Sequence, residues 1–374
     1  MPISESRSGL SSQTPPRDLY PSRLIAARKR RGLTKKGLAA AIGVSEKSLG
    51  FYEKGTTQPS ASTALGLAEA LGFPIEFFYI DEIDEVPVCA VSFRALSKLT
   101  ARERDQALAS AQIALTLSDW LERRFTLPEP SLPRYDDVRP EVAADALRRD
   151  WKLGEAPIRN VVHLLEMHGV RLFSLPPESR DLDAFSFWRG GTPYVFLNTV
   201  KSAERSRMDA THELGHLVLH RGAEAPRGKQ ADQEAQSFGA AFLMPRDSIL
   251  AEIPIGARLS HILYAKQKWG VSAASLTYRA HTVGLLTDWQ YRSAFIELGE
   301  RGLRRHEEGG TRETSQILAK VLRMLHDDGV RWSDIAEELH LPVSELNHVV
   351  FGLTWGNGRV PSDPDVERPD LKVV

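Results

Sequence analysis

The sequence predicts a mainly α-helical chain with one small β-sheet, an α+β fold built in three parts. Three observations support this prediction: a helix-turn-helix pattern near the N-terminus, a helix carrying H-E-x-x-H after two strand-like runs, and a gap-free repeat of the first pattern near the C-terminus. The expected segments are a disordered arm (1–16), an all-α domain (17–80), a linker with a long helix (81–133), an α+β domain (134–310), and a helical module with its tail (311–374).

Length and composition restrict the class of protein. The chain has 374 residues, of which 42% are hydrophobic and 26% charged, values typical of a globular protein with two or three domains. No apolar run is long enough to cross a bilayer, and residues 1–16 are rich in Ser and Pro without the apolar core of a signal peptide. Cys89 is the only cysteine, which excludes intrachain disulfides and is typical of a cytoplasmic protein.

The N-terminal pattern is defined by its caps and its turn. Thr34 precedes one short helix, Gly43 allows the turn after it, and Ser45 precedes a second helix. The apolar residues that would form the small core are Leu38, Ala39, Ile42, Val44 and Leu49. Together with Pro59-Ser60, this segment resembles the XRE (Cro/repressor-like) DNA-binding family, which implies double-stranded operator DNA as a partner.

The same resemblance implies that the helix after Ser45 enters the major groove. The candidate DNA-contacting residues are Ser45, Glu46, Lys47, Ser48 and Phe51 for bases, and Arg30, Lys35 and Lys36 for phosphates. Residues 17–60 hold ten basic side chains against three acidic ones, whereas the whole chain has a net charge of −1. This concentration of positive charge is typical of a domain that binds a phosphate backbone.

A long helix is expected between the two motif regions. It follows the cap Thr100 and runs to Phe125. Its apolar residues do not sustain a heptad repeat, so packing against the α+β domain (134–310) is favoured over a coiled-coil dimer. A helix is also expected over residues 138–151. In the segment 160–168 that follows, His163 and His168 lack ligand partners at a useful spacing and are predicted to be structural.

The segment 211–220 predicts a metal site. His212 and His216 stand four residues apart on one helix face, so both imidazoles can reach one ion. Glu213 lies about 100° round the helix, where its carboxylate can act as general base toward water. A chance match and a surface histidine pair are the alternatives, but the apolar neighbours make unpaired polar groups unfavourable here. His220 lies about 12 Å along the axis from His212 and is expected to end the helix or to contact a ligand rather than the ion.

A second helix over residues 230–245 is expected to supply the third ligand. Glu234 falls on the apolar stripe of Phe238 and Phe242, where a carboxylate is unfavourable unless a cation meets it. Two antiparallel helices would place Glu234 beside the histidine pair. The alternative role, a carboxylate that stabilises the helix N-terminus, suits Asp232 better.

These two helices resemble the ImmA/IrrE family of zinc metallopeptidases, whose hallmarks are H-E-L-G-H and a helix of the form E-A-N-x-F-A-A-x-L-L-M-P. The second helix here reads E-A-Q-S-F-G-A-A-F-L-M-P. The resemblance implies a zincin-like fold, a Zn²⁺ cofactor, Glu213 as catalytic base, and His212, His216 and Glu234 as metal ligands. Arg207 matches a family arginine, whereas Gln236, Gly239 and Met208-Asp209 depart from the family pattern and leave substrate choice open.

The resemblance extends on both sides of the metal-binding motif. Upstream, residues 183–187 and 193–198 are expected to form two strands around the turn 189–191, with an edge strand that aligns an extended substrate. Downstream, residues 263–284 are expected to form a helix pair with Ser272 as the cap of its second helix.

The C-terminal module repeats the spacing of the N-terminal pattern. Residues 335–346 align with residues 38–49 without a gap, and Gly352 falls where Gly55 does. The second helix of the repeat carries no Lys or Arg, and its flanks are acidic. Since such a surface repels phosphate, the module is predicted to contact protein, for example in a homodimer, rather than DNA.

These features favour a cytoplasmic DNA-binding regulator, with no membrane partner, whose zinc-dependent endopeptidase cleaves a protein. A transcriptional repressor is the favoured substrate, and a stress, phage or mobile-element response is the expected setting. Two alternatives remain open: a non-enzymatic transcription factor that senses a ligand or partner, and an antitoxin whose peptidase-like part binds a toxin. Glu213 argues against the first, because a purely structural zinc site does not need a general base.

Overall fold

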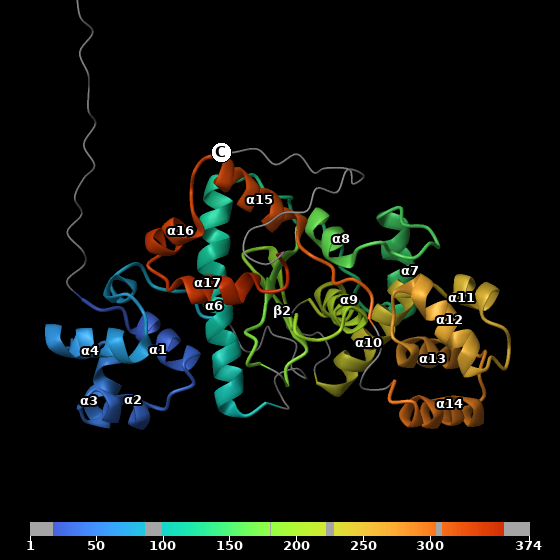
Figure 1. Ribbon diagram of the computed structural model, residues 1–374, viewed down its shortest axis with the longest axis horizontal. Coiled ribbons are helices and arrows are strands. Elements are labelled where there is room, and N and C mark those ends of the chain that lie inside the picture. The colour runs from blue at the N-terminus through green and yellow to red at the C-terminus, as the bar shows by residue number, and fades with distance from the viewer. Residues whose placement is uncertain (1–17, 87–98, 180, 222–227, 304–308, 355–374) are drawn as a thin grey trace, which may run out of the picture.

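The computed structural model describes residues 18–354 except 87–98, 180, 222–227 and 304–308. Its described part is mainly helical with a three-stranded sheet, which confirms the predicted fold class. The N-terminal helices, a central helix, the sheet and a terminal group of helices follow one another along the long axis (Figure 1). The expected disordered arm and Cys89 lie outside the described residues. Within the described part, no helix combines the length and the apolar character that a bilayer crossing requires.

The N-terminal domain contains the predicted helix-turn-helix. Its elements are α1 (Pro21–Arg30), α2 (Lys35–Ala41), α3 (Glu46–Tyr52), α4 (Ala61–Leu71) and the 3-10 helix η1 (Ile75–Phe78). Thr34 and Ser45 each accept a hydrogen bond from a backbone N–H in the first turn of the helix that follows, as predicted. Gly43 has a φ of 71°, a left-handed conformation that glycine adopts without a steric penalty. The short helices α2 and α3 depend on packing around Leu38 and Leu49, which are fully buried.

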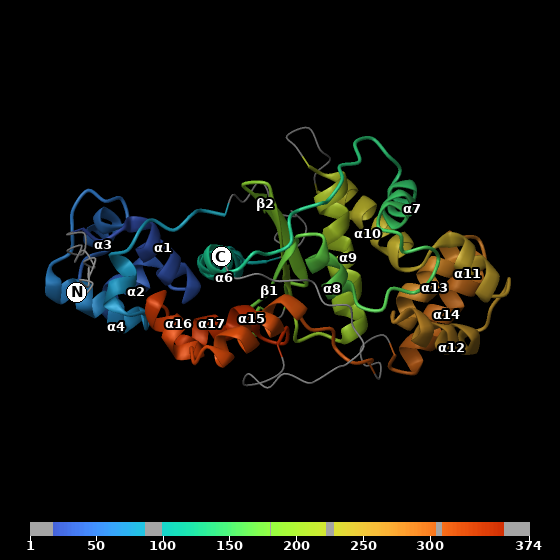
Figure 2. The same cartoon turned by 90° about the horizontal axis from the view of Figure 1, so that it is seen from above.

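Helix α6 (Ala101–Arg124) stands at the centre of the molecule, between the N-terminal domain and the sheet (Figure 2). Thr100 and Glu103 form a capping box at its start. Its middle turns are buried on every side, because α1 packs along it and Ser118 Oγ lies 3.3 Å from Tyr194 Oη of the sheet. The helix therefore packs on the sheet, as predicted, and also on α1 and α17 (Val343–Val350), which were not expected as partners.

The sheet has the order β1-β3-β2, with β1 (Arg171–Ser174) parallel and β2 (Ala184–Arg189) antiparallel to β3 (Thr192–Leu197). Strands β2 and β3 and the turn between them were predicted. Strand β1 was missed, because all four of its residues are buried and it has no alternation of polar and apolar positions.

Two long helices cross beside this sheet. The helices of this region are α7 (Pro140–Asp150), α8 (Val161–Met167), α9 (Ala203–Leu219) and α10 (Lys229–Leu243). Helix α9 packs on β2 and β3, and α10 packs on α9. Their backbones approach closely at two glycines: a Cβ on Gly215 would lie 3.0 Å from Ala235 Cα, and one on Gly239 would lie 3.1 Å from the backbone N of His212. This close crossing brings the first turns of α10 alongside the His212–His216 face.

The group of helices at the end of the molecule away from the N-terminal domain comprises α11 (Arg246–Glu252), α12 (Leu259–Trp269), α13 (Ala273–Thr282) and α14 (Asp288–Glu300) (Figure 1). Gly270 ends α12 in the left-handed conformation, and Ser272 caps α13. The predicted helix pair with its cap is therefore present, whereas α11 and α14 were not predicted.

The C-terminal module consists of α15 (Gln316–Asp327), α16 (Trp332–Glu338) and α17 (Val343–Val350). The repeat seen in the sequence is also a repeat of backbone conformation. His340 has a φ of 50° where Gly43 has 71°, and Gly352 and Gly55 both have 68°. Helix α17 packs against α6 and β1, so the module covers the centre of the molecule (Figures 1 and 2).

The described chain has two large apolar cores. One runs from the N-terminal domain through α6 and part of the sheet into the C-terminal module. The other joins the other side of the sheet to helices α7 to α14 and holds the H-E-x-x-H helix. Residues on both sides of the predicted boundaries at 80/81 and 310/311 share the first core, so the helix-turn-helix domain packs directly on the rest of the chain.

Candidate metal centre and candidate nucleic-acid interface

The candidate metal centre lies where α9 crosses the start of α10. His212 Nε2 and His216 Nε2 are 3.2 Å apart, and Asp232 Oδ1 is 3.6 Å from His212 Nε2. These three donor atoms lie within 4.8 Å of one another. Four ligands at the usual zinc distances would be separated by about 3.3 Å in a tetrahedron. The spacing and the nitrogen and oxygen donors therefore suit zinc.

Glu213 is held away from the ligands by the edge of the sheet. Its Oε2 accepts a hydrogen bond from Ser186 Oγ of β2 at 2.6 Å, and the residue is 2% exposed. Glu213 follows His212 directly on α9, and its carboxylate is not one of the three clustered donors. Ser186 was not singled out from the sequence; its place in a strand next to α9 is a tertiary feature.

The environment of His216 favours a neutral imidazole. Burial, followed by the neighbouring imidazoles of His212 and His220, holds the pKa of His216 well below its usual value. A neutral imidazole has a lone pair to offer a cation, and a charged one has none. His220 ends α9, as predicted, and its Nδ1 lies 2.9 Å from His216 Nδ1.

Asp232 and Glu234 stand on different faces of α10. Residues two apart on a helix are about 200° apart, so only one of them can face the histidine pair. Asp232 faces it, whereas Glu234 Oε2 lies 2.9 Å from His220 Nε2. Glu234 as a metal ligand stays a prediction, and the structure adds Asp232 as the nearer carboxylate. The sequence held a signal for Asp232: it lies three and seven residues before Ala235 and Gly239, the small residues that pack on α9.

Other histidines and the family arginine have structural contacts. His168 stacks on Trp151 with ring centroids 3.8 Å apart, which agrees with its predicted structural role. Arg207 is buried, pairs with Glu313 and donates to the backbone oxygen of Ile158 at 2.8 Å. It therefore anchors α9 to the segment that leads into the C-terminal module.

The candidate nucleic-acid interface is the outer side of the N-terminal domain. Helix α1 stands between α3 and α6 in both views, so α3 is turned away from the rest of the molecule (Figures 1 and 2). Of the predicted contact residues, those that are exposed are Lys36, Ser45, Glu46, Lys47 and Phe51. Ser48 is half-buried, and Lys35 is half-buried and pairs with Glu53 at 3.0 Å. The exposed side chains are accessible to DNA, and their contact with it stays a prediction.

Arg30 is the exception, because it is only 2% exposed. It pairs with Glu345 of α17 at 2.6 Å and with Glu178 at 2.8 Å, and its Nη2 lies 2.9 Å from His348 Nδ1. The prediction that Arg30 contacts phosphate is therefore wrong for this conformation. Sequence reasoning treated the basic end of α1 as one exposed surface, whereas its carboxylate partners are supplied by distant parts of the chain.

Several basic side chains of this domain pair with carboxylates of the same chain. Arg28 pairs with Glu53, Lys29 with Asp105 of α6, and Arg31 with Glu345. Among the basic residues of the described helix-turn-helix, Lys36, Lys47 and Lys54 are exposed. The excess of positive charge counted from the sequence thus overstates the charge presented to a phosphate backbone.

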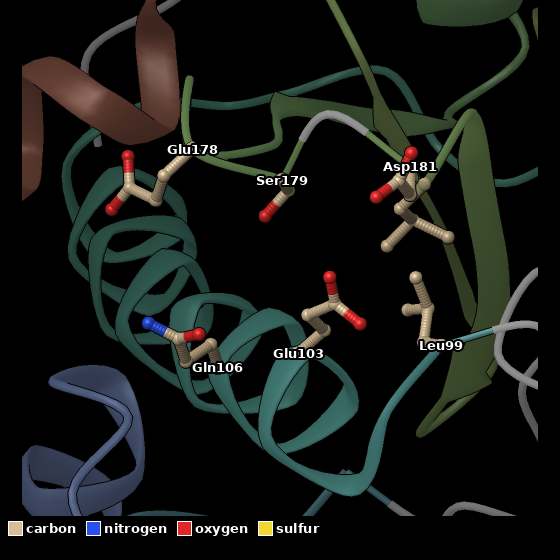
Figure 3. A pocket seen from close by; sticks show the side chains of 7 residues that line it. Leu99, Glu103, Gln106, Glu178, Ser179 and Asp181 are labelled. Carbon is tan, nitrogen blue, oxygen red and sulfur yellow. The ribbon is translucent and has the colours of Figure 1, made fainter.

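A pocket elsewhere in the molecule does not take part in either site. It lies between the start of α6 and the loop after β1, and Glu103 and Ser179 point into it (Figure 3). Two of its carboxylates already have partners, since Glu178 pairs with Arg30 and Glu103 accepts from Thr100. The pocket is therefore a gap between the start of α6 and residues 178–182, next to the Glu178–Arg30 ion pair.

Two family models match the chain. Residues 165–281 match the IrrE N-terminal-like domain, and residues 24–78 match a helix-turn-helix family. No curated protein matches the chain. The chain is a fusion of an XRE-type helix-turn-helix domain with an ImmA/IrrE-like metallopeptidase domain. It is thus a DNA-binding regulator with a peptidase-like domain, and the candidate metal centre lies inside the peptidase match.

Proposed function

We propose that this regulator is a cytoplasmic zinc-dependent endopeptidase that cleaves a regulatory protein. The observation that carries the proposal is the donor cluster of His212, His216 and Asp232, with Glu213 next to it in the chain. Three protein ligands and an adjacent carboxylate are what a catalytic zinc site needs, whereas a purely structural site has four protein ligands.

In this proposal each residue has one task. His212, His216 and Asp232 would hold a zinc ion, which would supply a Lewis acid for the peptide carbonyl. Glu213 takes a proton from the attacking water, and Ser186 fixes the direction of the Glu213 carboxylate through its 2.6 Å hydrogen bond. Glu234, the ligand expected from the family resemblance, is the rival of Asp232 for the third position.

The substrate we propose is an extended segment of a protein. Strand β2 is at an edge of the sheet among the described strands, and α9 packs beside it. An extended peptide could add to this edge through backbone hydrogen bonds. The fusion to a DNA-binding domain favours a transcriptional repressor as the substrate, and a stress, phage or mobile-element response as the setting.

Metal analysis tests the ligand set. The purified protein should hold about one zinc ion per chain. His212→Ala and Asp232→Ala should lose it, whereas Glu213→Gln should retain it. If Asp232→Ala keeps full zinc and Glu234→Ala does not, Glu234 is the third ligand.

Cleavage of candidate repressors tests the reaction. Zinc-loaded protein is incubated with each candidate, and products are identified by mass spectrometry. Glu213→Gln is the matched control, because it keeps the ligands and removes the base. If no candidate is cleaved, and Glu213→Gln regulates transcription as the wild type does, the non-enzymatic sensor becomes the preferred function.

Operator binding tests the other half of the proposal. Lys47→Glu reverses a charge at the start of α3 and should weaken binding to a selected operator by at least about 1–3 kcal/mol. Lys152→Glu makes the same charge change at an exposed position after α7 and is the matched control. Equal affinities of the two variants would contradict the assignment of α3 as the recognition helix.

A further inference from the structure

A chain of hydrogen-bonding side chains leads from the surface to Nδ1 of His216, the ring nitrogen that does not contact His212. His216 Nδ1 lies 2.9 Å from His220 Nδ1, and His220 Nε2 lies 2.9 Å from Glu234 Oε2. Gln230 Nε2 donates to the other carboxylate oxygen of Glu234 at 2.9 Å. His220 is almost fully buried, whereas Glu234 is partly exposed. The chain therefore connects a hydrated carboxylate to a buried ligand through one imidazole.

The partners permit one arrangement of protons for two neutral rings. An ionised carboxylate only accepts, so His220 must donate from Nε2, and its Nδ1 is then an acceptor. His216 must in turn donate from Nδ1, which leaves the lone pair of its Nε2 directed at the donor cluster.

We propose that Glu234 and His220 are positioning residues that fix the tautomer and the orientation of His216 for the metal. This inference rests on the proposed metal centre. It gives Glu234 a task other than direct ligation, in agreement with its position on the opposite face of α10 from Asp232. Residues that hold a ligating histidine through its second nitrogen commonly change metal affinity by about 10–100-fold when they are removed.

The first measurement is zinc affinity by competition with a chelator. Glu234→Ala and His220→Ala should bind zinc about 10–100-fold more weakly than the wild type. Glu234→Gln keeps an oxygen that accepts from His220, so its affinity should lie between those of Glu234→Ala and the wild type. Gln230→Ala is the matched control, because it removes a partner of Glu234 that does not lie between Glu234 and His216. This variant should bind zinc as the wild type does.

The second measurement reads the tautomer directly in metal-free protein. The ¹⁵N shifts of the His216 ring should report a protonated Nδ1 in the wild type and a mixture of tautomers in His220→Ala. Circular dichroism confirms that each variant is folded, and Glu234→Ala is expected to fold because its side chain reaches the surface.

Three results distinguish the possibilities. If Glu234→Ala loses zinc as completely as His212→Ala, Glu234 is a direct ligand and the positioning role is wrong. Wild-type affinity and an unchanged His216 tautomer in both alanine variants would also overturn it. If the wild type itself binds no zinc, the proposed function fails. The tautomer of His216 then still decides whether Glu234 and His220 position its ring.

Discussion

Replacing Glu345 with glutamine should destabilise the junction between the helix-turn-helix domain and the C-terminal module. Glu345 is fully buried, and its carboxylate pairs with Arg30 at 2.6 Å and with Arg31 at 2.5 Å. Glutamine has nearly the same shape but no charge. The substitution therefore removes the shared negative charge between two guanidinium groups without leaving a cavity.

The expected loss follows from what each arginine retains. Removing one partner of a buried ion pair costs about 3–5 kcal/mol, because the remaining charge is desolvated and uncompensated. Arg30 keeps its pair with Glu178, and Arg31 is partly exposed and keeps its bond to the Leu71 backbone oxygen. We therefore expect a loss near the lower end, about 3 kcal/mol in the free energy of unfolding.

Glu338→Gln is a matched control in the same module. Glu338 pairs with Arg124 of α6, but both side chains are exposed. Exposed pairs contribute about 0–1 kcal/mol. The assay is urea denaturation followed by tryptophan fluorescence, since Trp332 of α16 hydrogen bonds Asn347 of α17. If Glu345→Gln and Glu338→Gln lower the stability equally, burial does not set the strength of the Glu345 contacts and the reasoning is refuted.

Three further predictions concern pH, helix crossing and the module. Burial raises the pKa of Glu166 from its usual 4.5 to about 7, so between these pH values the folded chain holds a proton that the unfolded chain has lost. The free energy of unfolding should therefore fall as pH rises from 4.5 to 7. A denaturation series at several pH values should show a smaller fall for Glu166→Gln than for the wild type. Gly215→Ala should lower the stability of the protein, because overpacking against Ala235 costs about 1–3 kcal/mol and helix propensity gains only about 1 kcal/mol. Its zinc affinity should also drop. A more stable variant with unchanged zinc affinity would contradict this. Deleting residues 311–374 should expose the apolar surface of α6 and lower the melting temperature measured by calorimetry, and an unchanged melting temperature would show that the module contributes nothing to the shared core.

Local features were predictable because neighbouring residues determine them. Thr34, Ser45 and Ser272 each cap the expected helix, since a hydroxyl satisfies backbone N–H groups within one turn. The spacing of four between His212 and His216 required their placement on one helix face. The repeat in the C-terminal module was readable for the same reason, and His340 adopts the left-handed turn that Gly43 has in the first copy.

Tertiary structure decided which side chains the carboxylates of Asp232 and Glu345 contact. The choice of Asp232 beside the histidine pair depends on how closely α9 and α10 cross at Gly215 and Gly239, and a helical stripe does not specify that distance. Arg30 and Glu345 are 315 residues apart in sequence and meet only because α1 and α17 pack against the same central helix. The sequence by itself determined the two motifs, the helices that carry them and the caps of those helices, since these depend on short-range hydrogen bonding and periodicity. Only the packed structure determined whether a charged side chain faces water, DNA or a buried partner, because burial is a property of the whole fold.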